Sequence, residues 1–150
     1  MAETTLKELL SLSIDWTVRI SKFYSDFRDE IDDISFKNLL TTMIDQEGQY
    51  TNYYEENLKS LDYILDFNLR ANDTIEINID FEEMPDVKRM SKISFLKKAV
   101  HFQQISIKTC EFLGRLSKTS KGKQIFKELA DEESRHMSIF KDHLELEELF

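Results

Sequence analysis

The sequence predicts an all-α protein: a four-helix bundle made of two antiparallel helical hairpins. Two observations support this prediction. Only three glycines and one proline occur among the 150 residues, which is too few for the many tight turns of a sheet protein. Apolar residues also recur every three or four positions in four long segments, a spacing that places them on one face of a helix.

The first hairpin is expected at residues 4–29 and 36–67, with a polar turn between them in which Ser35 caps the second helix. The inward face of the first helix consists of Leu6, Leu9, Leu10, Ile14, Thr17, Ile20, Tyr24 and Phe27. That of the second consists of Leu39, Leu40, Met43, Glu47, Tyr50, Tyr54, Leu58 and Leu61. Gly48 lies inside the second helix at a cost of about 1 kcal/mol against alanine. We expect it to permit close helix packing or to leave space beside Glu47.

Residues 68–90 break the helical periodicity and are expected to form a long crossover. They include TIEINIDF, in which apolar and polar residues alternate, so this part could be extended. A connection of this length suits a chain that runs along a bundle, either to cover one of its faces or to reach a second subunit. Because the other two connections are short, the second and third helices should be parallel, which gives an up-down-down-up bundle.

The second hairpin is expected at residues 91–117 and 120–149, joined by a short basic turn. The inward positions of the third helix are Leu96, Ala99, Val100, Gln103, Ser106 or Ile107, Cys110 and Leu113. Those of the fourth are Phe126, Leu129, Ala130, Met137, Phe140 and Leu144. Glu133 and His136 share this last face. Because three residues turn a helix by about 300°, their side chains are neighbours that point inward.

Length and charge exclude several classes of protein. A chain of 150 residues suits one domain, residues 1–150. Its net charge of −9 repels phosphate backbones, so we expect no nucleic acid partner. Because it lacks both an apolar run of about 18 residues and a basic, apolar start, we expect no membrane span, no signal peptide and a cytoplasmic location. The single cysteine, Cys110, cannot form an internal disulfide and is expected in the core.

The two hairpins resemble each other in sequence. A shift of 86 positions aligns both helices and the turn without a gap, whereas unrelated amphipathic hairpins align less completely, so we favour a duplicated hairpin. The alignment pairs Glu47 with Glu133, Tyr50 with His136 and Thr17 with Gln103. A twofold arrangement should therefore bring six side chains to one level of the bundle: Thr17, Glu47, Tyr50, Gln103, Glu133 and His136.

Three stretches carry a family likeness. FKELADEESRH, which contains Glu133 and His136, resembles the second helix of a hairpin in the rubrerythrins, a family of the ferritin-like superfamily. FYSDF and AVHFQQISIKTCEFLG resemble the first helix of each hairpin. In this family each hairpin supplies one Glu from its first helix and Glu-x-x-His from its second, and these residues hold two iron ions that reduce peroxide or oxygen. The resemblance implies a ferritin-like bundle and a homodimer, and it leaves the electron donor unidentified.

The ligand set departs from the family pattern at three positions. The matching residues are Glu47, Glu133 and His136; the substituted ones are Thr17 and Gln103, in place of glutamates, and Tyr50, in place of a histidine. The Cys-x-x-Cys iron domain of many rubrerythrins is absent. Two carboxylates offer too little charge for two ferrous ions in a core. We therefore expect one ion of iron, zinc or manganese rather than two, with a metal-free site as an equal alternative.

Three functions are compatible with these residues. The first is a binding or scaffold role in which di-iron chemistry is lost or weakened. The polar core would then be hydrogen-bonded, for example from the Tyr50 hydroxyl to Glu133 and from the Gln103 amide to Glu47. The second is a protein that binds one metal ion through Glu47, Glu133 and His136, with Tyr50 as a further ligand. The third is a di-iron peroxidase or oxidoreductase of the rubrerythrin type, acting in peroxide or oxygen defence.

Other polar residues are not expected to carry chemistry. His101 falls on nearly the opposite face of its helix from the inward positions, and His143 lies about 10 Å along the axis from His136. The acidic pairs at 32–33 and 82–83 are expected to be solvated loop charges. Tyr53 is a candidate for a subunit contact.

Overall fold

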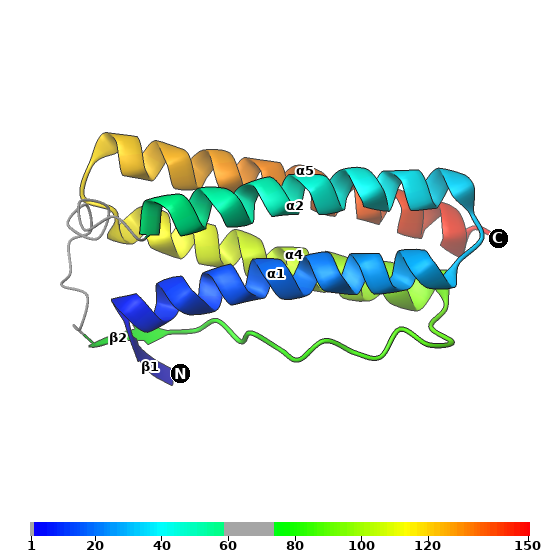
Figure 1. Cartoon of the computed structure of the whole chain (residues 1–150), viewed down its shortest axis with the longest axis horizontal. Coiled ribbons are helices and arrows are strands. Elements are labelled where there is room, and N and C mark those ends of the chain that lie inside the picture. The colour runs from blue at the N-terminus through cyan, green and yellow to red at the C-terminus, as the bar shows by residue number, and fades with distance from the viewer. Residues whose placement is uncertain (1, 59–73) are drawn as a thin grey trace.

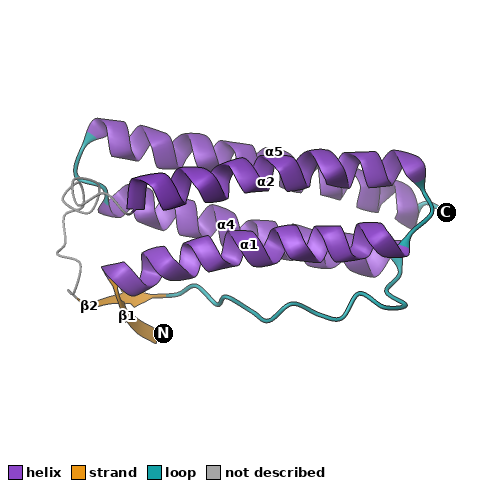
Figure 2. Cartoon of the chain, in the orientation of Figure 1, coloured by secondary structure: helices purple, strands orange, loops and turns teal. Residues whose placement is uncertain are grey.

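The computed structural model of this chain describes residues 2–58 and 74–150. Their elements are β1 (Ala2–Thr5), α1 (Leu6–Glu30), α2 (Ile34–Leu58), β2 (Thr74–Ile77), α4 (Lys92–Leu116) and α5 (Ser120–Glu148). The four long helices pack into an all-α bundle with a small two-stranded sheet at one end (Figure 1; Figure 2). The predicted fold class is therefore confirmed. The predicted continuation of the second helix through residue 67 lies outside the described residues.

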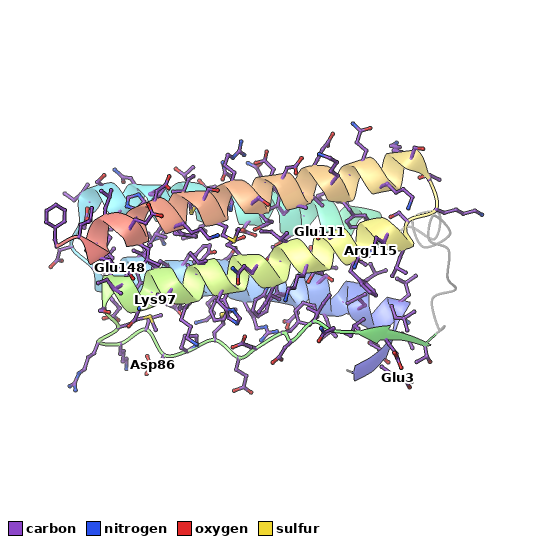
Figure 3. All side chains as sticks on the ribbon, turned by 180° about the vertical axis from the view of Figure 1, so that it is seen from behind. Glu3, Asp86, Lys97, Glu111, Arg115 and Glu148 are labelled. Carbon is purple, nitrogen blue, oxygen red and sulfur yellow. The ribbon has the colours of Figure 1, made fainter. Side chains whose placement is uncertain are left out.

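The helices form two antiparallel hairpins, α1 with α2 and α4 with α5 (Figure 1). α2 and α4 run in the same direction, so the arrangement is up-down-down-up, as predicted. Figure 3 shows the second hairpin from behind, with Lys97 near the start of α4 and Glu148 at the end of α5. Their charged groups are 3.9 Å apart, as expected for the two ends of an antiparallel pair.

The structure corrects the predicted start of α2. The carboxylate of Asp33 accepts a hydrogen bond from the backbone N–H of Phe36 at 3.1 Å, so Asp33 caps this helix and the prediction of Ser35 was wrong. A carboxylate is well suited to this place because it accepts the free N–H groups and faces the positive end of the helix dipole. The Phe36 N–H also holds the pKa of Asp33 below its ordinary value. Asp33 further contacts Lys92, so it is not simply a solvated loop charge.

The described part of the crossover begins with a strand. Thr74–Ile77 is extended, as the alternation in TIEINIDF predicts, and pairs antiparallel with β1 at the N-terminus. Thr5 ends β1 and caps α1 by accepting a hydrogen bond from the backbone N–H of Glu8 at 3.1 Å. The strand β1 was not predicted from the sequence. The first helix therefore begins two residues later than predicted.

Residues 78–91 then run along the whole bundle (Figure 2). Their apolar side chains pack on the core, with the Phe81 ring 5.7 Å from that of Trp16 on α1. Glu82 contacts His101 on α4, and its backbone oxygen accepts from Arg19 on α1 at 2.9 Å. The crossover was predicted either to cover a face of the bundle or to reach a second subunit. Residues 78–91 cover a face of the bundle. The prediction that Glu82 is a free loop charge was wrong.

The core has apolar ends and a polar middle layer. The larger apolar cluster is rich in aromatic rings and centres on Phe95, and the smaller one, next to the sheet, contains Cys110 as predicted. On the four helices the buried polar residues lie in the region where the two clusters meet. They are Ser13 and Thr17 on α1, Glu47 on α2, Gln103, Ser106 and Thr109 on α4, and Glu133 and His136 on α5.

Two further findings bear on the helices. A Cβ atom added at Gly48 would meet no described atom within 4 Å, so close packing of a neighbouring helix does not explain this glycine and that expectation was wrong. None of the described helices has an apolar stretch long enough to cross a membrane.

Candidate metal centre

Three side chains of the polar layer meet in one place. Glu47 of α2 and both Glu133 and His136 of α5 each offer a donor atom, and these atoms lie within 4.8 Å of one another. Their exposed fractions are 1%, 5% and 1%. Two buried carboxylates cost several kcal/mol unless they are neutralised by a proton, a cation or a metal ion. The group is therefore a candidate metal site.

Helix spacing accounts for the convergence of the three side chains. On α5, Ala130, Glu133, His136 and Phe140 are all buried and follow the three- and four-residue spacing of one helix face. On α2, Glu47 lies one turn after the buried Met43. The apolar residues on either side of these positions are buried in the bundle. Because the polar side chains lie on the same helix faces, they are buried as well.

The imidazole of His136 is held by α2. Its Nε2 lies 2.5 Å from Oε1 of Gln46, and its Nδ1 lies 3.2 Å from Oε1 of Glu47. Because an amide oxygen only accepts, Nε2 carries a hydrogen and Nδ1 faces the carboxylate. Metal-binding histidines are commonly oriented in this way by a partner for the second nitrogen. Gln46 was not predicted, since a half-buried glutamine beside Glu47 has no sequence pattern of its own.

Gln103 connects the two hairpins. Its amide nitrogen donates to the Tyr24 hydroxyl at 2.6 Å and to Oε1 of Glu47 at 3.2 Å. The bond to Glu47 was predicted and is confirmed. Tyr24 was predicted to face inward, but not to belong to the site. Burial, and then the negative charge of Glu47, raise the pKa of Tyr24 well above its ordinary value, so its hydroxyl stays protonated.

Three buried oxygen atoms of the centre have no hydrogen-bond partner among the described residues: Oε2 of Glu47, Oε1 of Gln103 and Oε2 of Glu133. Carboxylate and amide oxygens are acceptors. Each buried group left unpaired costs about 1–3 kcal/mol. Acceptors supplied by three helices suit a bound cation, and in its absence a proton on Glu133 is the donor within the group.

The centre contains two buried carboxyl groups and no buried lysine or arginine among the described residues. In the part of the chain that the structure describes, neither carboxylate forms an ion pair with lysine or arginine, and the partner of Glu47 is His136. Burial, followed by the charge of Glu47, raises the pKa of Glu133 well above its ordinary value. Without a metal these effects favour a proton on Glu133, and a metal ion would displace it.

Tyr50 and Thr17 lie beside this centre but do not direct their hydroxyl groups at the donor atoms. The Tyr50 hydroxyl donates to Glu132 at 3.2 Å, so the predicted bond to Glu133 was wrong. Burial and then the charge of Glu133 raise the pKa of Tyr50, which disfavours a phenolate ligand. The Thr17 hydroxyl donates to the backbone oxygen of Ser13 on its own helix, at 3.0 Å.

All six predicted site residues nevertheless lie around one level of the bundle. The ring of Tyr50 is 6.2 Å from that of His136. Tyr50 and Thr17 also line, together with Glu133, a cavity of about 10 Å³ that is bounded by residues of all four helices. This is roughly the space of one water molecule. The two other histidines lie elsewhere, as predicted: His101 is exposed and contacts Glu82, and His143 packs on Phe36 at 5.4 Å.

No known protein family, curated protein or solved structure matches this chain. The resemblance to rubrerythrins rests on the quoted motifs and stays a prediction. The structure itself contains a buried group of Glu47, Glu133 and His136 that could bind a metal ion.

Proposed function

We propose that this protein is a rubrerythrin-like bundle that binds a single divalent metal ion, of iron, zinc or manganese, through Glu47, Glu133 and His136. One observation carries the proposal: Glu47, Glu133 and His136 offer three buried ligand atoms within 4.8 Å of one another, and each of the two carboxylates keeps one oxygen without a hydrogen-bond partner among the described residues. Oxygen and imidazole ligands suit these three metals, and a site with three protein ligands leaves an open position.

The balance of charge favours one ion over two. Two carboxylates neutralise one divalent ion, whereas a second ion would leave two positive charges uncompensated in a low-dielectric core. Gln103 offers only a neutral oxygen, and the Tyr50 hydroxyl donates to Glu132. The substitutions that distinguish this chain from the rubrerythrin pattern therefore support a smaller centre.

Each neighbour of the three ligands has a distinct part in this proposal. Gln46 holds the second nitrogen of His136, and Gln103 holds one oxygen of Glu47, so both ligands are oriented before the ion arrives. A bound ion would supply Lewis-acid chemistry, and iron or manganese would add redox chemistry. Peroxide or oxygen reduction is what the family resemblance implies for such a centre.

A metal-free scaffold is the second candidate, and the bond between Gln103 and Glu47 favours it. That contact was predicted for a polar core stabilised by hydrogen bonds alone. The proton retained by Glu133 would then take the place of a metal ion. The protein would act by binding a partner rather than by metal chemistry.

Metal analysis separates these functions. Purified protein is loaded anaerobically with Fe²⁺, Zn²⁺ or Mn²⁺, desalted, and analysed for metal per chain. We expect about one ion per chain, lost in Glu133→Ala and in His136→Ala. His143→Gln changes an imidazole two turns further along the same helix, outside the centre, and should retain the ion.

Other metal contents would overturn this proposal. About two iron ions per chain would support the di-iron oxidoreductase. No retained metal in the wild-type protein would leave the scaffold role.

A further inference from the structure

A groove on the surface leads toward the centre. It has a volume of about 360 Å³ and is lined by residues of α2 and α5, among them Gln49, Tyr50, Tyr53, Glu128, Leu129 and Glu132. Glu128 is exposed, and Glu132 is partly exposed. The charged side chains of the lining are both acidic, and Arg135 pairs with Glu132, so the groove attracts cations mainly through the remaining charge of Glu128.

The groove and the inner cavity share part of their walls. Tyr50 and Leu129 line both the groove and the cavity of about 10 Å³ inside the bundle. Glu133 lines the cavity but not the groove. Glu133 is 5% exposed, and its Oε2 has no partner in the described structure. A single layer of side chains therefore separates an acidic surface from an unpaired metal-ligand carboxylate.

Of these two side chains, Tyr50 is the more exposed. Leu129 is buried within the smaller apolar cluster, whereas Tyr50 is half-buried. Its hydroxyl is held by Glu132, and the same carboxylate also contacts Arg135. A cation that arrives at Glu132 competes with both groups and so releases the Tyr50 ring.

We propose that this groove is the loading route of the metal centre. A divalent cation binds first between Glu128 and Glu132, the Tyr50 ring turns aside, and the ion reaches Glu133. This inference rests on the proposed function, because it concerns a cation that the centre then retains. It assigns to Glu128, Glu132 and Tyr50 roles in the rate of loading rather than in the final coordination.

The single tryptophan provides a direct measurement. Trp16 is buried and lines the inner cavity, so a paramagnetic ion such as Co²⁺ should quench its emission on arrival. Metal-free protein is mixed with Co²⁺ in a stopped-flow instrument, and release is followed after addition of a chelator. The equilibrium affinity is titrated separately by the same emission.

The expected changes are kinetic. Glu128→Gln combined with Glu132→Gln should slow loading about fivefold at low salt, and the difference should shrink at high ionic strength. Tyr50→Ala should raise loading and release rates alike, by about tenfold, and so leave the affinity nearly unchanged. Tyr50→Phe keeps the ring but loses the bond to Glu132, and should load faster than wild type by a smaller factor. Glu145→Gln removes one charge from an exposed site on the same helix and should load at the wild-type rate.

The outcomes distinguish this route from the metal site itself. If wild-type protein takes up Co²⁺ while all groove variants load and release at its rate, the route is overturned and the proposed function stands. A loss of affinity in both Tyr50→Ala and Tyr50→Phe without faster loading would make Tyr50 a ligand, and would also overturn the route. If wild-type protein binds no Co²⁺ at equilibrium and also retains no Fe²⁺, Zn²⁺ or Mn²⁺ in the metal analysis, the proposed function fails and the route with it.

Discussion

Glu133 combines two opposed properties. A metal ion requires its ionised form, but burial and the neighbouring charge of Glu47 raise its pKa well above 4.5 and favour the protonated form. The carboxylate that suits the centre to a cation therefore weakens the metal-free fold when it ionises. Ionisation of Glu133 therefore favours metal binding but lowers the stability of the metal-free fold.

The pH dependence follows from this shift. Above the unfolded-state pKa of Glu133 and up to its folded-state pKa, the folded protein binds more protons than the unfolded chain. The contribution of Glu133 to the unfolding free energy of the metal-free protein is therefore present at low pH and is lost as the pH rises. We expect Glu133→Gln, measured by urea unfolding with EDTA, to have a higher unfolding free energy than wild type at pH 8 and a smaller difference at pH 5.

The exposed residue Glu128 provides the control for this experiment. Glu128→Gln removes the same charge from the surface of α5 and should follow the wild-type pH profile. A Glu133→Gln variant that is less stable than wild type at pH 8 would contradict the interpretation.

The three side chains of the candidate centre were predictable and their hydrogen-bond partners were not. Glu47, Glu133 and His136 were predicted because helix spacing decides the face on which a side chain lies, and the repeat pairs the two hairpins. Tyr24 and Gln46 were missed, because their roles depend on the rotamer of a side chain on another helix. Tyr50 lies on the predicted face, but its long side chain reaches past Glu133 to Glu132.

At the scale of elements, α2 contains a glycine that packing does not require. An added Cβ at Gly48 meets no described atom within 4 Å. Gly48→Ala should therefore raise the unfolding free energy by about 0.5–1 kcal/mol through helix propensity. Thermal unfolding followed by circular dichroism should show a rise in Tm of about 1–4 °C.

Gly114 on α4 is a suitable comparison for Gly48. A Cβ there would lie 3.4 Å from Cβ of Phe126, so the same substitution should yield a smaller gain. A fall in Tm for Gly48→Ala would show that this position needs a glycine for another reason.

Helix boundaries and strands were predicted less well than the helices themselves. The four helices extend over many turns, so apolar periodicity identifies them without knowledge of their neighbours. Asp33 was passed over in favour of Ser35 because both residues are good helix caps and only the local backbone decides between them. The segment Ala2–Thr5 has no alternating pattern, and it is a strand only because it meets Thr74–Ile77 from a distant part of the chain.

At the scale of the whole molecule, one end of the bundle is held together by aromatic rings. Phe95 stacks on Phe27 at 4.0 Å and contacts Phe23 at 4.9 Å and Phe36 at 6.0 Å. It is fully buried, whereas Phe112 on the same helix is partly exposed. The polar layer lies away from this cluster, in the middle of the bundle.

Phe95→Ala should lower the unfolding free energy by about 3–5 kcal/mol, because it opens a cavity where α1, α2 and α4 meet. Phe112→Ala should cost much less, since it removes a partly exposed ring from the same helix. Urea unfolding of both variants in EDTA measures the difference. Equal losses would mean that the aromatic cluster does not dominate the stability of the bundle.

The topology of the molecule was predictable from the lengths of its connections. Two short turns and one long crossover leave few arrangements, and residues 78–91 run along the bundle as expected. Which face they cover was not predictable, because contacts such as Phe81 with Trp16 join segments far apart in the sequence. Such contacts arise from complementary shapes rather than from local periodicity.

The distribution of the ligands between the hairpins has a mechanical consequence. Glu47 belongs to the first hairpin, and Glu133, 86 positions later, belongs to the second. An ion that both residues bind would be a removable cross-link across a long loop of the chain, and because its site exists only in the folded state it would stabilise the fold by mass action. Chelation would then remove this tie between the two halves of the protein and leave their aromatic core and the turn within each half intact.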